Sequence, residues 1–172
     1  MTDSFAFAFC PYDGTRLAAR PDADGVARPA CPACGFIDYG NPKPCVAVLV
    51  EEGGRLLLGR RAVEPAKGLW DILGGFIDAG ESAEEAAHRE ILEESGLRVT
   101  ITRYLGTFPD TYGPRGLPVL NLGFVAVPVG GSLRSASDVA ELRWFAAGEL
   151  PQTWAFPHQP KLIEAWRGVG LV

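Results

Sequence analysis

The sequence lacks several features, and each absence argues against a class of protein. Its 172 residues carry 16 basic against 21 acidic side chains, and this net charge of −5 argues against a general nucleic-acid or membrane-surface binder. Uninterrupted apolar runs reach only six residues, as at 45–50, whereas a membrane-spanning helix needs about 20. The N-terminus has neither the basic region nor the long apolar stretch of a secretory signal. We therefore expect a cytoplasmic protein that binds neither nucleic acid nor membranes.

What is present is an ordinary globular composition, with 47% apolar and 22% charged residues. A chain of 172 residues has room for about one full domain and a small appendage. The first forty residues are rich in turn-forming residues and hold three of the 4 cysteines, and the prolines of Asn41–Pro44 are typical of a linker. The sequence therefore predicts an appendage over 1–40 and a main domain over 41–172.

Short β-rich runs surround one clear helix in the main domain. Ser82, with Glu85 three residues later, forms a capping box at the helix start, and Gly96 suits the helix end. A second helix is expected over 159–167, so the arrangement favours an α+β architecture. The expected strands cover residues 45–50, 55–59, 70–77, 98–107, 120–129 and 142–145, the first two joined by a hairpin turn at 51–54.

Three glutamates share one face of the first helix. Glu90, Glu93 and Glu94 stand at i, i+3 and i+4, so like charges meet near the helix C-terminus, where the macrodipole disfavours anions. A solvated surface is the simple interpretation of such a run of charge. The alternative is a cation site, and oxygen ligands without histidine or thiolate favour Mg²⁺, or Mn²⁺ in its place.

The residues around these glutamates favour the cation site, because they match a known motif at every specified position. The segment reads Gly75-x5-Glu81-x7-Arg89-Glu90-Ile91-x-Glu93-Glu94-x-Gly96-Leu97. It resembles the Nudix box, and the resemblance extends over about 45–145. One departure is Leu73, where the family commonly has proline. The resemblance implies an α/β/α sandwich that uses Mg²⁺ to hydrolyse the pyrophosphate bond of a nucleoside diphosphate linked to another group.

The resemblance also assigns roles to residues. The carbonyl oxygen of Gly74 and the carboxylates of Glu90, Glu93 and Glu94 would hold the metal, and the first glutamate of the motif would lie at the edge of that cluster. Arg89, Glu90 and Glu94 would be catalytic. Arg89 would orient a glutamate, and we expect Glu90 to take the proton of the attacking water.

Two short cysteine motifs precede the main domain. Cys31-Pro-Ala-Cys34-Gly35 has the spacing of a zinc knuckle, and Cys10-Pro-Tyr-Asp13-Gly14 repeats it with aspartate at the second ligand position. The pair resembles the zinc ribbon that precedes some Nudix domains. Because a carboxylate oxygen can bind zinc, these three cysteines and one aspartate form a feasible Zn²⁺ site; the alternative is a relic ribbon with free thiols. We expect Cys45, at the start of an apolar run, to be a buried core residue.

The sequence gives weaker indications of the substrate. NADH-specific members of the family carry a Ser-Gln-Pro-Trp-Pro-Phe-Pro-like signature soon after the box. This chain lacks it there, and we interpret a partial echo at 152–158 as unrelated. We therefore expect an ADP-ribose-like or dinucleotide substrate, a small-molecule nucleotide in either case. The alternative function is a nucleotide-sensing module, and a homodimer is compatible with the family.

Five residues are candidates for substrate binding. Arg60 and Arg61 end a strand before the box and can contact phosphate. Phe108 and Tyr112 are expected in a loop rich in proline and glycine, where they either stack on a base or close the core. Glu141 precedes the last strand, and in this family an acidic residue there, as Asp138 also is, can supply a further metal ligand or base.

Overall fold

The computed structural model describes residues 7–168. Within this range no helix is both long enough and apolar enough to cross a membrane. In chain order the elements are β1 (Ala18–Pro21), β2 (Ala27–Ala30), β3 (Lys43–Glu52), β4 (Arg55–Arg61), β5 (Trp70–Asp71), α1 (Ala83–Ser95), β6 (Leu97–Tyr112), β7 (Leu117–Gly131), β8 (Val139–Ala146) and α2 (Gln159–Gly168).

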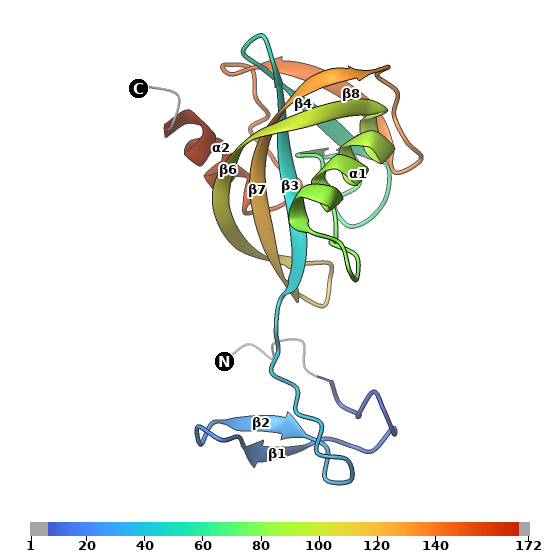
Figure 1. The fold of residues 1–172 in the computed structure, drawn as a ribbon, viewed down its shortest axis with the longest axis vertical. Helices are drawn as coiled ribbons and strands as arrows, with labels where there is room; N and C mark the ends of the chain where they lie inside the picture. Colours follow the sequence, from blue (N-terminus) through green and yellow to red (C-terminus); the bar gives the residue numbers. More distant parts are fainter. Residues whose placement is uncertain (1–6, 169–172) are drawn as a thin grey trace.

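Strands β1 and β2 form a small antiparallel hairpin of their own. Figure 1 shows this hairpin apart from the larger body, joined to it by the segment that leads into β3. The remaining strands form one mixed sheet in the order β5-β4-β3-β7-β6, and β8 pairs with β4. Strands β3 and β7 run parallel, while the other neighbours in this sheet are antiparallel.

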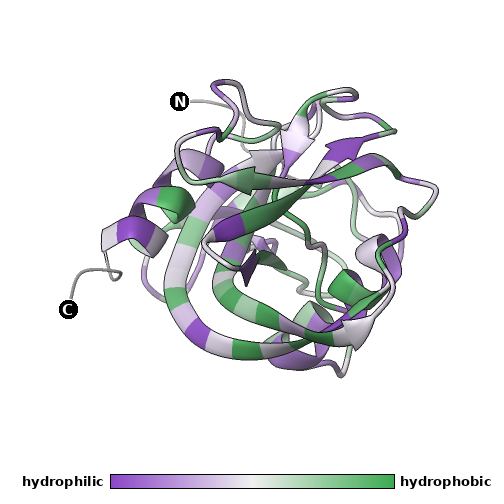
Figure 2. Cartoon of the chain, turned by 90° about the horizontal axis from the view of Figure 1, so that it is seen from above, coloured by the Kyte–Doolittle hydropathy of each residue, from purple (hydrophilic) through white to green (hydrophobic). Residues whose placement is uncertain are grey.

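Strand β3 separates two apolar layers, because successive side chains of a strand point to opposite faces. Val46 and Val48 pack in one layer with Ala87 and other residues of α1. Leu49 packs in the other layer with Leu162 of α2. A helix therefore covers each face of the sheet, which explains why the run 45–50 is apolar throughout rather than alternating. Apolar and paler segments alternate along the long curved strands in Figure 2. The predicted α+β sandwich is confirmed.

Three local expectations were wrong. The strand expected over 70–77 consists of β5 alone, followed by isolated bridges from Leu73 and Phe76 to β3, because Gly74 takes a backbone φ of 146° that ordinary strands do not adopt. Strand β3 begins at Lys43, so Pro44, expected in the linker, is the second residue of the strand, while Pro42 precedes it. Strand β6 continues to Tyr112 instead of ending at 107, and it tolerates Pro109 because it lies at the edge of the sheet.

Candidate active site

Helix α1 begins and ends where the sequence predicts. The Ser82 hydroxyl accepts a hydrogen bond from the Glu85 backbone N–H at 3.2 Å, and the Glu85 carboxylate accepts one from the Ser82 N–H at 2.8 Å. Gly96 ends the helix in the left-handed region, with φ of 71°. Ala86, Ala87 and Ile91 are buried against the sheet, and this fixes the direction in which the glutamates of the last turns point.

Arg89 binds Glu81, the first glutamate of the motif, through two of its three guanidinium nitrogens. Its Nε and one terminal nitrogen each donate to Glu81 at 2.8 Å, and these bonds, with a further one from the Asp78 N–H, lower the pKa of Glu81 to about 2. The other terminal nitrogen donates to Glu90 at 2.8 Å and reaches Glu93 at 3.4 Å. One arginine thus holds the Glu90 carboxylate in a single orientation.

Glu94 lies in the last turn of α1 and is partly buried. One of its oxygens accepts a hydrogen bond from the Gly74 N–H at 2.9 Å. Burial raises the pKa of Glu94 well above its usual value; the Gly74 N–H opposes this, and the negative charges of Asp71, Glu90 and Asp138 add to it. No basic side chain is paired with Glu94 among residues 7–168. The site therefore holds more negative charge than its own cations neutralise.

Glu90 packs against the glycine pair that precedes the helix. A Cβ atom built at Gly75 would lie 2.4 Å from the nearer Glu90 oxygen, so only glycine leaves room for the carboxylate in this position. Burial raises the pKa of Glu90, partly opposed by Arg89. The neighbouring carbonyls of Leu73 and Gly75 accept hydrogen bonds from β3, whereas no partner for the Gly74 carbonyl is found in the described part of the chain.

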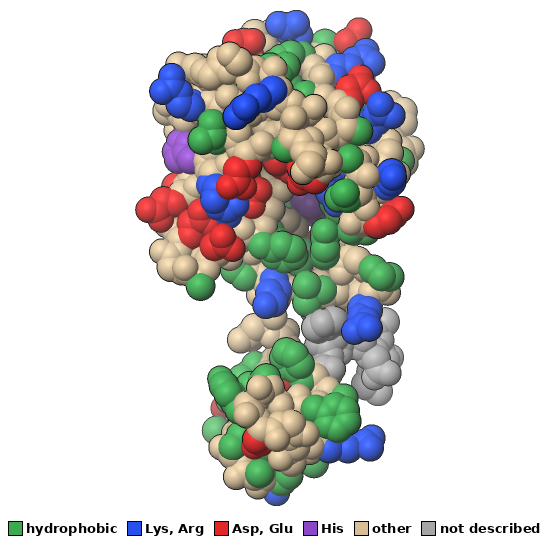
Figure 3. Space-filling view, turned by 90° about the vertical axis from the view of Figure 1, so that its right-hand side faces the viewer, with side chains coloured by type: hydrophobic (Ala, Val, Ile, Leu, Met, Phe, Trp, Pro, Cys, Tyr) green, Lys and Arg blue, Asp and Glu red, His purple; other side chains and the backbone are tan. Residues whose placement is uncertain are grey.

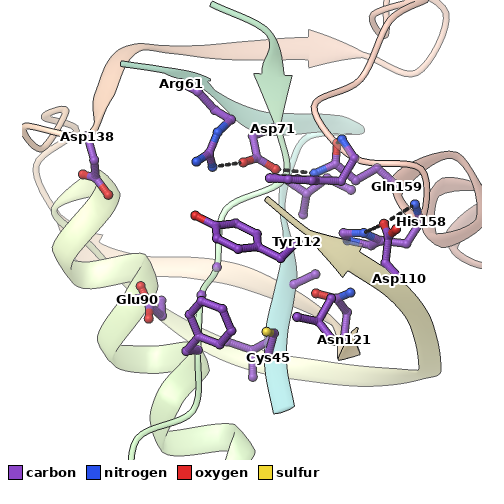
Figure 4. A pocket seen from close by; sticks show the side chains of 18 of the residues that line it. Cys45, Arg61, Asp71, Glu90, Asp110, Tyr112, Asn121, Asp138, His158 and Gln159 are labelled. Atoms are coloured by element: carbon purple, nitrogen blue, oxygen red, sulfur yellow. Dashed lines mark hydrogen bonds and ion pairs between the residues drawn. The ribbon is translucent and has the colours of Figure 1, made fainter. Parts of the chain in front are cut away.

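A cavity of about 310 Å³ opens beside these carboxylates. Figure 3 shows the hollow, with acidic side chains gathered along one side and hydrophobic side chains below it. Glu90 and Asp138 stand on the α1 side of the cavity in Figure 4, whereas Asp110 and His158 stand on the opposite side. The cavity therefore has an acidic end and a second end built from β6 and the start of α2.

The second end combines aromatic rings with buried polar pairs. Tyr112 lies between Phe76 and Phe156, with ring centroids 5.5 and 5.7 Å away. Arg61 donates to Asp71 at 2.7 Å, and its guanidinium lies 5.1 Å from the Phe156 ring centre. Two further pairs, Gln159 with Asp71 and His158 with Asp110, complete the wall. A flat ring bearing polar edges fits such a surface.

The NUDIX domain model matches residues 41–166. The chain belongs to the NUDIX family. It is similar to the NAD-capped RNA hydrolase NudC of Chromobacterium violaceum, with 36% identity over 148 residues that cover 83% of this chain and 51% of that one. It is also similar to the ADP-ribose pyrophosphatase of Methanocaldococcus jannaschii, with 37% identity over 128 residues that cover 73% of each chain. The chain spans about half the length of the NudC relatives that it matches.

A solved structure agrees with this assignment. The crystal structure of a NUDIX hydrolase from Nitrosomonas europaea matches with a TM-score of 0.77 at 28% identity and covers 95% of this chain and 94% of that one. The match covers both the NUDIX domain and most of the N-terminal segment, because 95% coverage leaves out only a few residues in all.

Not all the candidate residues of the NUDIX domain meet at the cavity. Arg61 and Tyr112 line it, but Arg60 points elsewhere and pairs with Glu141 at 2.9 Å across β4 and β8. Phe108 packs in the apolar layer beneath α2, which is the core-closing alternative. Glu141 and Phe108 thus do not line the cavity: Glu141 stands opposite Arg60 in the β4–β8 register, and Phe108 packs against the apolar layer that contains Leu162.

The three box glutamates also differ in their surroundings. Glu90 and Glu94 are partly buried, whereas the Glu93 side chain is 59% exposed. Within residues 7–168 the three do not form a tight set of ligand atoms in the way that the cysteine motifs do. Cys45 is buried as expected, but it also lines the cavity.

Sequence reasoning missed several cavity residues, among them Asp71, Asp110 and His158. Asp71 and Asp110 lie on strands, and His158 precedes α2. For His158 a signal existed, since it belongs to the partial echo of a substrate signature at 152–158 that we took as unrelated. For the two aspartates, spacing along the chain offers no signal, because each comes from a different element.

The N-terminal cysteine motifs converge as two equivalent turns. In each, the N–H of the glycine donates to the carbonyl of the first cysteine, at 3.0 Å for Gly14 and 3.1 Å for Gly35. The sulfur atoms and one carboxylate oxygen all lie within 4.8 Å of one another; the residues are Cys10, Asp13, Cys31 and Cys34. This arrangement of three thiols and a carboxylate suits a tetrahedral metal ion.

Proposed function

We propose that this protein hydrolyses the pyrophosphate bond of a nucleoside diphosphate linked to another group, with Mg²⁺ or Mn²⁺ as cofactor. The observation that carries the proposal is the excess of negative charge at the acidic end of the cavity, next to which Glu94 lies partly buried without a basic partner. A divalent cation offsets such charge, and hard carboxylate oxygens are its preferred ligands. Similarity to an ADP-ribose pyrophosphatase supports the same chemistry.

The metal would be held by Glu90, Glu93 and Glu94 together with the Gly74 carbonyl, whose oxygen has no described partner. When bound, it would neutralise phosphate charge and make water a better nucleophile. The Glu90 carboxylate, held by Arg89 at 2.8 Å, would accept the proton of the attacking water. Glu94, fixed by the Gly74 N–H, completes the catalytic set.

A further acidic group lies on the loop before β8. The sequence led us to expect Glu141 there, but Glu141 pairs with Arg60, while Asp138 lines the cavity and lies close enough to raise the pKa of both Glu90 and Glu94. We infer that Asp138 supplies the additional metal ligand or base that this loop can provide.

We also propose that the N-terminal motifs bind one structural Zn²⁺ through three thiolates and Asp13. The Asp13 carboxylate is suited to be an anionic ligand, because hydrogen bonds from Thr15 lower its pKa. A short, turn-rich segment gains stability from such a site, since it cannot bury a core of its own. On this proposal the segment 1–40 is a zinc-ribbon appendage of a NUDIX domain over 41–172.

The substrate we propose is a small-molecule nucleotide, ADP-ribose-like or a dinucleotide. The aromatic and polar second end of the cavity supports a nucleoside at that position, next to the acidic end where the diphosphate would lie. A cytoplasmic location and a homodimer remain predictions, which fractionation and light scattering would test.

The test is a panel of ADP-ribose, NADH, dinucleoside polyphosphates and nucleotide sugars, incubated with Mg²⁺ while released mononucleotide is measured. We expect turnover that EDTA abolishes and that Glu90→Gln lowers at least about 100-fold. Glu84→Gln is the matched control, because Glu84 is an exposed residue of the same helix. Binding of these ligands without turnover would overturn hydrolysis and favour the nucleotide sensor.

A further inference from the structure

At the second end of the cavity, His158 has one ring nitrogen that is hydrogen-bonded within the described residues and one that is not. His158 is only 6% exposed, and its Nδ1 lies 2.8 Å from an oxygen of Asp110. That same oxygen accepts the backbone N–H of His158 at 2.9 Å. No residue between 7 and 168 forms a hydrogen bond with Nε2 of His158. A polar ring is thus fixed in place while one of its polar atoms has no protein partner.

The Asp110 carboxylate determines what the free nitrogen offers. An ionised carboxylate can only accept hydrogen bonds, so Nδ1 of the neutral ring carries the proton and donates it to Asp110. Nε2 then presents a lone pair, which accepts a hydrogen bond from a ligand. In Figure 4 the ring lies on the cavity side of Asp110, and His158 lines the cavity.

We propose that the Asp110–His158 pair reads the base of the nucleotide substrate, with Nε2 of His158 accepting a hydrogen bond from an exocyclic amine such as that of adenine. The proposal rests on the proposed function, because it assumes that the nucleoside occupies this end of the cavity. Asp110 is the positioning residue, and His158 is the residue that contacts the substrate.

Two neighbouring features favour a base over a sugar hydroxyl as the group that donates. The rings of Tyr112 and Phe156 lie 5.7 Å apart on the same wall, and Phe156 stacks against His158 with 19° between their planes. Flat aromatic surfaces of this kind stack on bases regardless of base identity. Asn121, also 6% exposed, uses its amide N–H on the Phe108 carbonyl, which leaves its oxygen as a second acceptor in the cavity lining. The wall therefore offers acceptors to a flat ring that carries donors.

The decisive comparison is adenine against hypoxanthine, which has the same shape but a carbonyl oxygen in place of the amine. Adenosine and inosine carry no phosphate and need no metal, so NMR titration of the protein in EDTA at pH 8 measures recognition without catalysis. We expect adenosine to bind at least about tenfold more tightly than inosine, which corresponds to about 1.4 kcal/mol.

Two substitutions separate recognition from structure. His158→Asn keeps an amide donor near Asp110 but places nothing at the Nε2 position, so it should abolish most of the adenosine preference. His158→Gln can place an amide oxygen near that position and should keep part of the preference. His88→Asn is the matched control, because the second histidine of the chain is exposed on α1. A purely structural role would lower the melting temperature of both His158 variants while leaving the preference unchanged.

Each outcome has a separate meaning. Equal binding of adenosine and inosine, preference for inosine, no binding of either at millimolar concentration, or an unchanged preference in His158→Asn would overturn the proposal. Selective binding of adenosine by a protein that hydrolyses nothing would support it and overturn the proposed hydrolysis alone. In an active protein, the kcat/KM ratio of ADP-ribose to its hypoxanthine analogue should show the same preference and the same loss in His158→Asn.

Discussion

Adding one methyl group at Gly75 or at Gly74 should separate catalysis from folding. At Gly75 the new Cβ would lie 2.4 Å from the nearer Glu90 oxygen and 2.7 Å from the carboxyl carbon. The backbone there is acceptable to alanine, since its φ is not in the left-handed region, so the flexible end of Glu90 must move by about 1 Å. A displacement of that size at a reacting group costs about 100-fold in rate. We expect Gly75→Ala to lose activity by about that factor while it keeps most of its stability.

At Gly74 the same methyl group meets the backbone instead of a side chain. Its Cβ would lie 2.1 Å from the Val46 carbonyl oxygen, and φ is 146°. Neither β3 nor the glycine can adjust cheaply, so we expect a loss of about 3 kcal/mol or more in the free energy of unfolding. For a chain of this size that lowers the melting temperature by about 6–12 °C.

The assay is thermal unfolding of both variants beside turnover of the best substrate from the panel, with the Mg²⁺-induced rise in melting temperature as a readout that does not require turnover. Full activity in Gly75→Ala would refute the placement of Glu90 at the site. A wild-type melting temperature in Gly74→Ala would refute the close approach of this loop to β3.

Two further predictions concern the metal sites. Burial raises the pKa of Glu94, so in the absence of metal the folded state loses stability as the pH rises from the ordinary carboxyl range through this raised pKa. In EDTA at pH 8, Glu94→Gln should therefore melt several degrees above the wild type, and this difference in melting temperature should narrow towards pH 5. Mg²⁺ should raise the melting temperature of the wild type only. A lower melting temperature for the variant in EDTA would contradict this reasoning. At the N-terminal site, elemental analysis after dialysis should find one zinc per chain. Asp13→Cys should retain the zinc, and Asp13→Ala should lose it faster to a chelator. Absence of zinc from the wild type would rule the site out.

The parts of the fold that were predictable are those set by local chemistry. The ends of α1 follow from the capping box at Ser82 and the left-handed glycine at 96, both of which act within one turn of the helix. The β3–β4 hairpin follows from its glycine pair. By contrast, the path through Gly74 depends on a close approach to Val46, and the length of β6 depends on pairing with β7. The residues next to Gly74 and those at the end of β6 do not predict either of these long-range contacts.

The same distinction applies to the site. The Arg89 and glutamate cluster lies within one stretch of helix, so spacing alone places these side chains on one face. Of Arg60 and Arg61, only Arg61 lines the cavity; the β4–β8 pairing shifts register between these two residues, and spacing along the chain gives no sign of that shift. The partner of Arg60 is Glu141 for the same reason: the two residues stand opposite each other in that register.

The two ends of the cavity therefore have different origins. Apart from Asp138, the acidic end comes from one continuous segment, in which the loop through Gly74 and Gly75 meets the last turns of α1, so the proposed chemistry could be inferred from the motif that identifies the family. The second end joins β6 to the start of α2, with Asp110 and His158 lying 48 positions apart in the sequence. Only the folded sheet brings them together. On the proposal above, we expect substitutions there to change the preferred substrate without disturbing the carboxylates of α1, because a complete box predicts a reaction type but does not identify the substrate.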